Sequence, residues 1–85
     1  MPDLIPSQKF IKALSKMSGE DQKRIKLALG KMQNDPRHNS LRTKKIKALN
    51  DMFESRASVS LRIIWQWHDG HILLIMVGGH EIVEY

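Results

Sequence analysis

The sequence predicts an α+β fold in which an N-terminal αα-hairpin packs on one face of a small antiparallel β-sheet. Apolar residues recur at helical spacing up to about residue 34 and at a period of two from residue 52 onward. A one-faced pair of helices needs a sheet to cover. The chain has 85 residues, so we expect residues 1–85 to form a single domain.

Two helices with their own start signals are expected in the first part of the chain. The first spans residues 7–17, with Ser7 as N-cap and Phe10, Leu14 and Met17 on one face. The second begins after Ser18, which forms a capping-box pattern with Asp21. It runs to about Asn34, because the residue before Pro36 disfavours helical geometry. Its buried stripe consists of Ile25, Ala28, Leu29 and Met32.

Three strands are expected at about 52–58, 61–68 and 71–77. Asp69-Gly70 predicts a type I′ turn, which pairs His68 with His71, Trp67 with Ile72, Trp65 with Leu74 and Ile63 with Met76. The apolar rows at Trp67, Trp65 and Ile63 should face the helices. Both tryptophans are therefore interpreted as core, and so are Met17, Met32 and Met76.

Composition excludes several classes of function. There is no cysteine, which excludes disulfide frameworks, Cys-ligated zinc and thiol catalysis. The longest apolar run, residues 72–77, is far shorter than the ~20 residues that span a bilayer. No signal-peptide pattern is seen near the N-terminus, so we expect a soluble cytoplasmic protein.

Charge is unevenly distributed along the chain. Residues 1–50 carry 12 Lys/Arg against 4 Asp/Glu, whereas residues 51–85 carry 2 against 5. The basic half indicates a polyanionic partner such as nucleic acid or an acidic protein segment. The alternative is a pair of solvated, lysine-rich helix faces. Residues 37–51 are the most basic stretch and are expected to form a loop and a partial strand.

The strand pattern predicts a basic corner of the sheet. A tight turn at residues 58–60 pairs Arg56 with Arg62 on the face opposite the helices, and Val77 completes that row. The chain then leaves through Gly78-Gly79 into His80. Like charges directly opposite each other are destabilising, which suggests an anion between them.

Phosphate is the expected anion, because paired guanidinium groups bind its oxygens in bidentate fashion. His80 is suited to proton transfer near neutral pH, and Tyr85 supplies a phenol donor and a ring for stacking on a base. These groups suit metal-independent cleavage of RNA. No Asp/Glu cluster that holds Mg²⁺ is evident, and no metal or other cofactor is expected.

Each of these interpretations has a structural alternative. Arg56 and Arg62 would then form only salt bridges, for instance with Glu54 or Glu81, while His80 would be a surface residue and Tyr85 a frayed terminus. His68 and His71 face each other across the turn and are more simply a solvated hairpin tip than a metal site.

Several motifs, in order, resemble one known family. They are the helical hairpin, Asp-Pro-Arg-His, a lysine-rich segment leading to the first long strand, Met-Phe-Glu-Ser-Arg, Leu-Arg-Ile-Ile-Trp, the Asp-Gly turn and Val-Gly-Gly-His. Together they resemble the RelE/ParE toxin superfamily, whose members are the small basic toxins of type II toxin–antitoxin pairs. The resemblance covers about residues 6–80 and implies a small curved antiparallel sheet with two N-terminal helices on one face.

The resemblance also implies function and site residues. RelE-like members are ribosome-dependent mRNA endonucleases, ParE-like members inhibit DNA gyrase without catalysis, and both bind an antitoxin. Arg62 matches the arginine of a Tyr-Arg strand motif, Arg56 a phosphate-contacting residue, His80 a catalytic position and Tyr85 a C-terminal aromatic. The residues expected to bind ribosomal RNA or the substrate are Lys23, Arg24, Lys26, Lys31, Lys44, Lys45 and Lys47.

This sequence departs from the superfamily pattern on two strands. Leu61 replaces the usual tyrosine, and Glu54 stands where the best-known nucleases have a lysine. Three hypotheses therefore follow: an mRNA endoribonuclease toxin, a gyrase-inhibiting toxin, and an inactive module that only binds an antitoxin.

Overall fold

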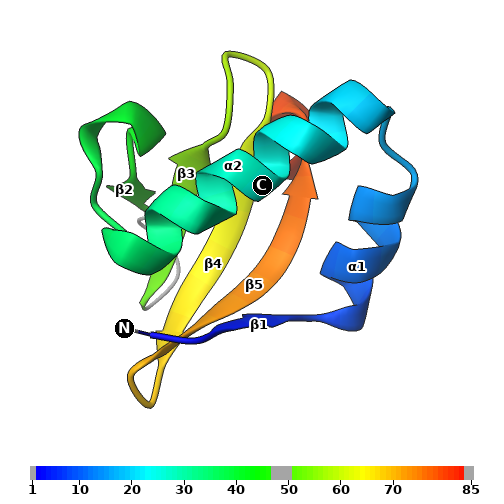
Figure 1. The fold of residues 1–85 in the computed structure, drawn as a ribbon. Coiled ribbons are helices and arrows are strands. Elements are labelled where there is room, and N and C mark those ends of the chain that lie inside the picture. Colours follow the sequence, from blue (N-terminus) through cyan, green and yellow to red (C-terminus); the bar gives the residue numbers. More distant parts are fainter. Residues whose placement is uncertain (1, 47–50, 84–85) are drawn as a thin grey trace.

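The computed structural model describes residues 2–46 and 51–83, and within them it shows two helices packed against a five-stranded sheet (Figure 1). The helical elements are α1 (Gln8–Ser15), α2 (Gly19–Asn34) and the 3₁₀ helices η1 (Asn39–Leu41) and η2 (His80–Val83). The strands are β1 (Leu4–Pro6), β2 (Lys44–Lys45), β3 (Met52–Arg56), β4 (Arg62–His68) and β5 (His71–Gly78). None of the helices in these residues has the length and apolar character needed to cross a membrane.

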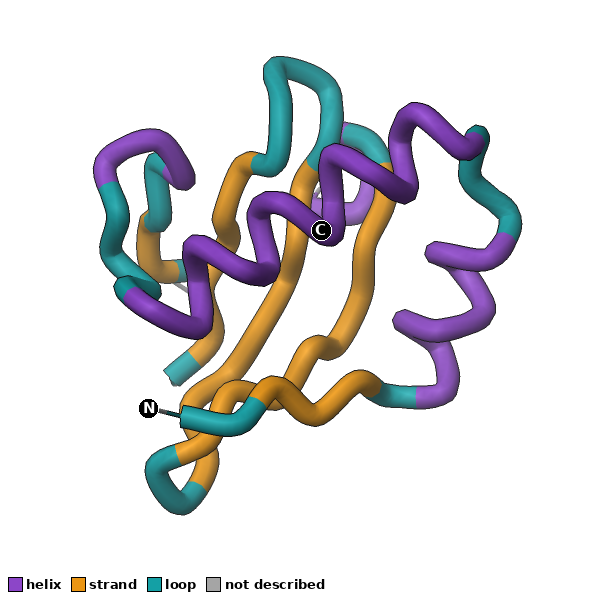
Figure 2. Tube along the Cα trace, viewed as in Figure 1, coloured by secondary structure: helices purple, strands orange, loops and turns teal. Residues whose placement is uncertain are grey.

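The helices and the sheet form two layers around one core. In Figure 2, α2 crosses one face of the sheet, and α1 lies beside β5. The core between the layers includes Phe10 from α1, Ile25 and Met32 from α2, and Ile63 and Trp65 from β4. The predicted α+β architecture is therefore confirmed.

Both predicted helix starts are confirmed by their hydrogen bonds. The Ser7 hydroxyl accepts from the Phe10 amide at 3.0 Å and donates to the Ile75 carbonyl at 2.9 Å. It therefore caps α1 and fastens the start of that helix to β5. The Ser18 hydroxyl caps α2 by accepting from the Asp21 amide at 3.1 Å.

The sheet is open and mixed, with strand order β1-β5-β4-β3-β2. Its three long strands are antiparallel, as predicted, and the short strand β2 adds an antiparallel edge beside β3. The other edge strand, β1, runs parallel to β5, with Leu4 opposite Ile72. The sequence pattern does not predict β1, because three residues are too few to show a period of two.

The predicted register of the β4–β5 hairpin is correct from the turn to Trp65 and wrong beyond it. His68 pairs with His71 and Trp65 with Leu74, but a β-bulge then shifts the pairing by one residue. Ile63 consequently pairs with Val77 and not with Met76. Val77 is buried in the core, whereas Met76 is only partly buried and does not belong to it.

Trp65 connects the core to the basic segment that precedes β3. Its ring stacks on Phe53 with centroids 4.7 Å apart, and its Nε1–H donates to Ser55 Oγ at 2.8 Å. Ser55 Oγ lies 2.6 Å from Thr43 Oγ1, which donates to the Pro36 carbonyl at 3.0 Å. This chain of hydrogen bonds fixes the segment after α2 against the sheet.

Candidate functional site

Three strands bring the predicted corner together as one row on the face of the sheet away from α2. Arg56 is directly opposite Arg62, and Arg62 is opposite Gly78. The sequence places Val77 in this row, which is wrong because the bulge shifts the register by one residue. From Gly78 the chain passes through one further glycine into η2, which begins at His80.

Arg62 is buried and fully engaged with its surroundings. Its side chain is only 6% exposed. Nη1 donates to the Val59 carbonyl at 2.7 Å and to the Ser58 carbonyl at 3.3 Å, so the guanidinium braces the turn between β3 and β4. Nε lies 3.5 Å from Glu54 Oε1. The salt bridge that was the alternative interpretation of this arginine is therefore present.

Glu54 neutralises positive charge at the centre of the row. Its side chain is 6% exposed, and its carboxylate has two cationic neighbours, because Oε2 is also 3.8 Å from Lys44 Nζ. Glu54 is opposite Ile64, two residues along β4 from Arg62, so both side chains lie on the same face of the sheet. Lys44, which was predicted to bind RNA, therefore has a carboxylate partner in the fold.

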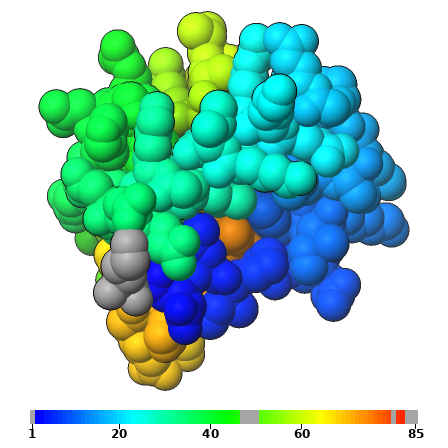
Figure 3. All heavy atoms as spheres, viewed as in Figure 1, coloured from blue at the N-terminus to red at the C-terminus, as the bar shows by residue number. Residues whose placement is uncertain are grey.

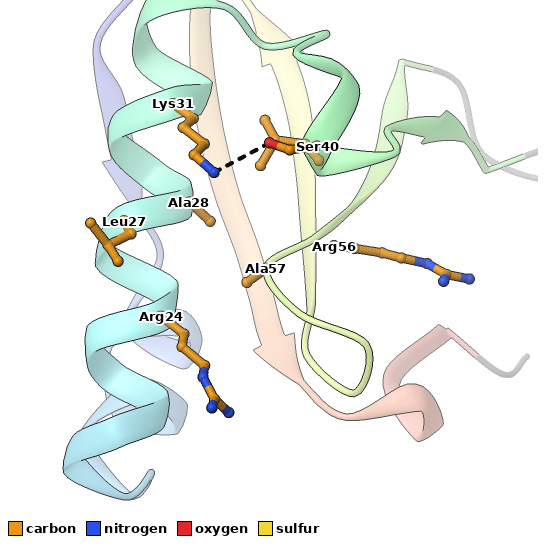
Figure 4. Close-up of a pocket in the computed structure, with 8 residues that line it drawn as sticks. Arg24, Leu27, Ala28, Lys31, Ser40, Arg56 and Ala57 are labelled. Atoms are coloured by element: carbon orange, nitrogen blue, oxygen red, sulfur yellow. Dashed lines mark hydrogen bonds between the residues drawn. The ribbon is translucent and has the colours of Figure 1, made fainter.

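Arg56 differs from Arg62 in its surroundings. Its side chain is partly exposed, and among the described residues it forms no ion pair. Figure 4 shows its guanidinium extending away from α2, beyond the strand that carries it. In the part of the chain described, Arg56 is the arginine of the row that is open to an anion from solvent.

A close contact fixes η2 over this face. A Cβ at Gly78 would lie 2.8 Å from Ile82 Cγ2, a distance that real Cβ contacts do not show. Glycine at this position therefore lets Ile82 pack directly on β5. The same isoleucine lines a hollow with Ile64 and Ile75 on the open face. The start of η2 is thus held next to the arginine row.

The predicted RNA-binding residues do not all lie together. Arg24 and Lys31 line one cleft with Arg56 (Figure 4). Lys26 instead lines an apolar groove of about 290 Å³ between α1 and α2, where Figure 3 shows the orange β5 at the bottom of a hollow. Lys23 and Lys45 are exposed and line neither of these.

Some candidate groups lie outside what the structure describes, namely all of Lys47 and Tyr85 and the side chain of His80. Conversely, Ser40 and Arg42 line cavities beside Arg56 although the sequence does not single them out. Arg42 belongs to the basic stretch after α2, but its left-handed backbone at φ 47° cannot be read from the residue type.

The two histidines of the β4–β5 turn each lie near a carboxylate. His68 Nε2 is 3.4 Å from Asp69 Oδ2, and His71 Nδ1 is 3.8 Å from Asp3 Oδ2. Over residues 2–46 and 51–83, no group of three or more metal-ligating side chains is found.

The fold matches several solved structures, whereas the comparisons with family models and curated proteins find no match. The RelE toxin in the RelB–RelE antitoxin–toxin complex from Methanococcus jannaschii superposes with a TM-score of 0.77 at 25% identity over 93% of both chains. The RelE–RelB complex from Pyrococcus horikoshii gives 0.76 at 16% identity, covering 92% of this chain and 93% of that one. The DinJ–YafQ complex from E. coli gives 0.78 at 14% identity, covering 96% and 97%.

Each of these matches covers nearly the whole of this chain and nearly the whole of the chain to which it is compared. The resemblance to RelE-type toxins that the sequence predicts is therefore confirmed, and the chain has the RelE toxin fold.

Proposed function

We propose that this protein is the toxin of a type II toxin–antitoxin pair and acts as a ribosome-dependent mRNA endoribonuclease. The observation that carries the proposal is the row of Arg56, Arg62 and Gly78, which leads into the segment of His80 on a RelE fold. A single domain of 85 residues in the cytoplasm is part of the same proposal.

The arginines have different roles in this proposal. Arg56 contacts the scissile phosphate, because its guanidinium extends from the row and has no ion pair among the described residues. Arg62 has a structural role, since it is buried, pairs with Glu54 and donates hydrogen bonds to the turn before β4. The general acid and base are assigned to His80 and Tyr85, whose roles stay predictions.

The reaction requires no metal. A base removes the proton of a ribose 2′-hydroxyl, the 2′-oxygen attacks the neighbouring phosphorus, and the bond from phosphorus to the 5′-oxygen breaks. An acid protonates that departing oxygen. The arginine stabilises the charge that builds on the phosphorane, and such a preorganised contact contributes about 3–4 kcal/mol to lowering a barrier.

The proposed partners are mRNA, ribosomal RNA and a cognate antitoxin. The RelE and YafQ structures that share this fold include complexes with the antitoxins RelB and DinJ, which supports an antitoxin here. The exposed lysines of α2 and its one arginine, Arg24, support binding to the phosphates of ribosomal RNA.

Induced expression in bacteria tests this function. We expect the wild type to arrest growth and to create new mRNA ends, detected by primer extension, while Arg56→Ala and His80→Ala do neither. Lys16→Ala is the matched control, because Lys16 is an exposed cation at the C-cap of α1. Arrest with intact mRNA and inhibited DNA supercoiling would instead identify a gyrase inhibitor. No arrest by a folded protein would contradict the toxin assignment.

A further inference from the structure

A basic cleft separates α2 from η1 and the end of β3. Its polar lining comes from Arg24 and Lys31 on α2, Ser40 on η1 and the stem of Arg56 on β3. Its floor contains the buried Ala28 and Leu41. The cleft has a volume of about 110 Å³. Figure 4 shows Lys31 extending across it toward η1.

The two cations from α2 are not equivalent. Arg24 Nη2 lies 2.7 Å from Glu20 Oε1, so a carboxylate already balances its charge. Lys31 Nζ instead donates to the neutral hydroxyl of Ser40 at 3.3 Å, and it has no carboxylate partner in the described part of the chain. The hydroxyl holds the ammonium over the cleft and leaves its charge available.

A second hollow of about 200 Å³ continues the cleft around the end of β3. It shares Ser40 and Arg56 with the first and adds Arg42 and Ser58. Together the two hollows connect Lys31 with Arg56, whose guanidinium lies on the other side of the strand (Figure 4).

Arg42 occupies this path in a strained conformation. Its φ of 47° and ψ of 45° are left-handed, which costs a non-glycine residue about 1–2 kcal/mol. Glycine would adopt this geometry without that cost. An arginine kept in such a conformation is the kind of outlier that occurs at ligand sites.

We propose that this basic cleft binds a second phosphate of a single-stranded RNA, whose backbone runs from Lys31 past Arg42 to Arg56. The inference rests on the proposed function and adds a binding path to it. Ammonium, guanidinium and hydroxyl groups are the usual contacts to nucleic-acid phosphates, and single strands follow positively charged grooves. A helical peptide needs an extended apolar groove, which two small hollows with charged rims do not provide.

The affinity of the protein for a short fluorescein-labelled RNA tests this path. Every 2′-hydroxyl of the RNA is methylated, so that the RNA can bind but cannot be cleaved. The test variant is the double substitution Lys31→Gln with Arg42→Gly, in which the glycine removes the cation and relieves the backbone strain. The matched control is Lys12→Gln with Lys16→Gln, since Lys12 on α1 and Lys16 at its C-cap are both exposed and the change in net charge is the same. Thermal unfolding confirms that both variants are folded.

Fluorescence anisotropy should show the cleft variant binding about 25-fold more weakly than the wild type in 0.1 M salt. Each contact to a single strand contributes about 0.7 to the slope of log K against log salt, so the slope should fall by about 1.4. The α1 control should show a smaller change in both quantities.

Equal RNA affinities of the cleft variant and the α1 control would overturn the proposal. Loss of binding to polyglutamate with no loss of binding to RNA would also overturn it and would indicate an acidic protein partner. The proposed function is judged separately by mRNA cleavage. A wild type that cleaves no mRNA but binds RNA through the cleft would refute only the nuclease, and cleavage without cleft-dependent binding would refute only this path.

Discussion

Replacement of Arg62 by alanine tests whether this arginine is mainly structural. The substitution removes a buried guanidinium that donates to the Val59 and Ser58 carbonyls and faces Glu54. Glu54 then remains in a site where only 6% of its side chain is exposed. An unpartnered buried charge is far more costly than a missing contact.

The magnitude follows from the geometry of this ion pair. Removing one member of a buried pair costs about 3–5 kcal/mol. Nε and Oε1 are 3.5 Å apart, and Lys44 Nζ stays 3.8 Å from the other carboxylate oxygen. We therefore expect the lower end of the range, about 3 kcal/mol, for Arg62→Ala. The free energy of unfolding of native proteins is about 5–15 kcal/mol, so the variant should stay folded but lose much of its stability.

Urea denaturation followed by the fluorescence of Trp65 and Trp67, which both pack in or against the core, measures this loss. The double variant Arg62→Ala with Glu54→Ala removes both charges, so it should be more stable than Arg62→Ala alone. A loss below about 1 kcal/mol for Arg62→Ala, or strictly additive effects of the two substitutions, would refute the account of a buried, mutually dependent pair.

Two further predictions concern the frame around the site. Ser55→Ala leaves the Trp65 indole N–H without its acceptor and should lower the free energy of unfolding by about 1–3 kcal/mol in the same urea assay. A loss below about 0.5 kcal/mol would contradict the role given to this hydrogen bond. Gly78→Ala places a Cβ 2.8 Å from Ile82 Cγ2 and should displace η2, so the Ile82 amide should exchange its hydrogen faster. Gly79→Ala is the matched control, because its Cβ meets only a flexible carboxylate, and equal exchange in the two variants would contradict the contact.

Local signals in the sequence predict much of this fold. Ser7 and Ser18 have the side chains that helix starts require, and each caps the helix that follows it. Asp69-Gly70 sets the hairpin register through both residues' positive φ angles. These features depend on a few neighbouring residues, which is why they can be read from the sequence.

The remaining features depend on contacts between distant segments. The bulge near Trp65 is a shift in the pairing of β4 with β5, and strand β1 is defined only by its pairing with β5. The burial of Arg62 depends on Glu54 and on the path of the turn between β3 and β4. For the same reason the sequence pairs the two arginines correctly but does not show that only Arg56 faces solvent with no ion pair among the described residues.

The most direct measurement is cleavage of a defined mRNA on purified ribosomes, mapped and timed by primer extension, with the wild-type protein beside Arg56→Gln. Loss of one preorganised charge contact should slow cleavage by about 100- to 1,000-fold while the protein remains folded. Lys12→Gln should cleave at nearly the wild-type rate. Intact mRNA with the folded wild type, or equal rates for the wild type and Arg56→Gln, would contradict an RNA-cleaving site built around this arginine.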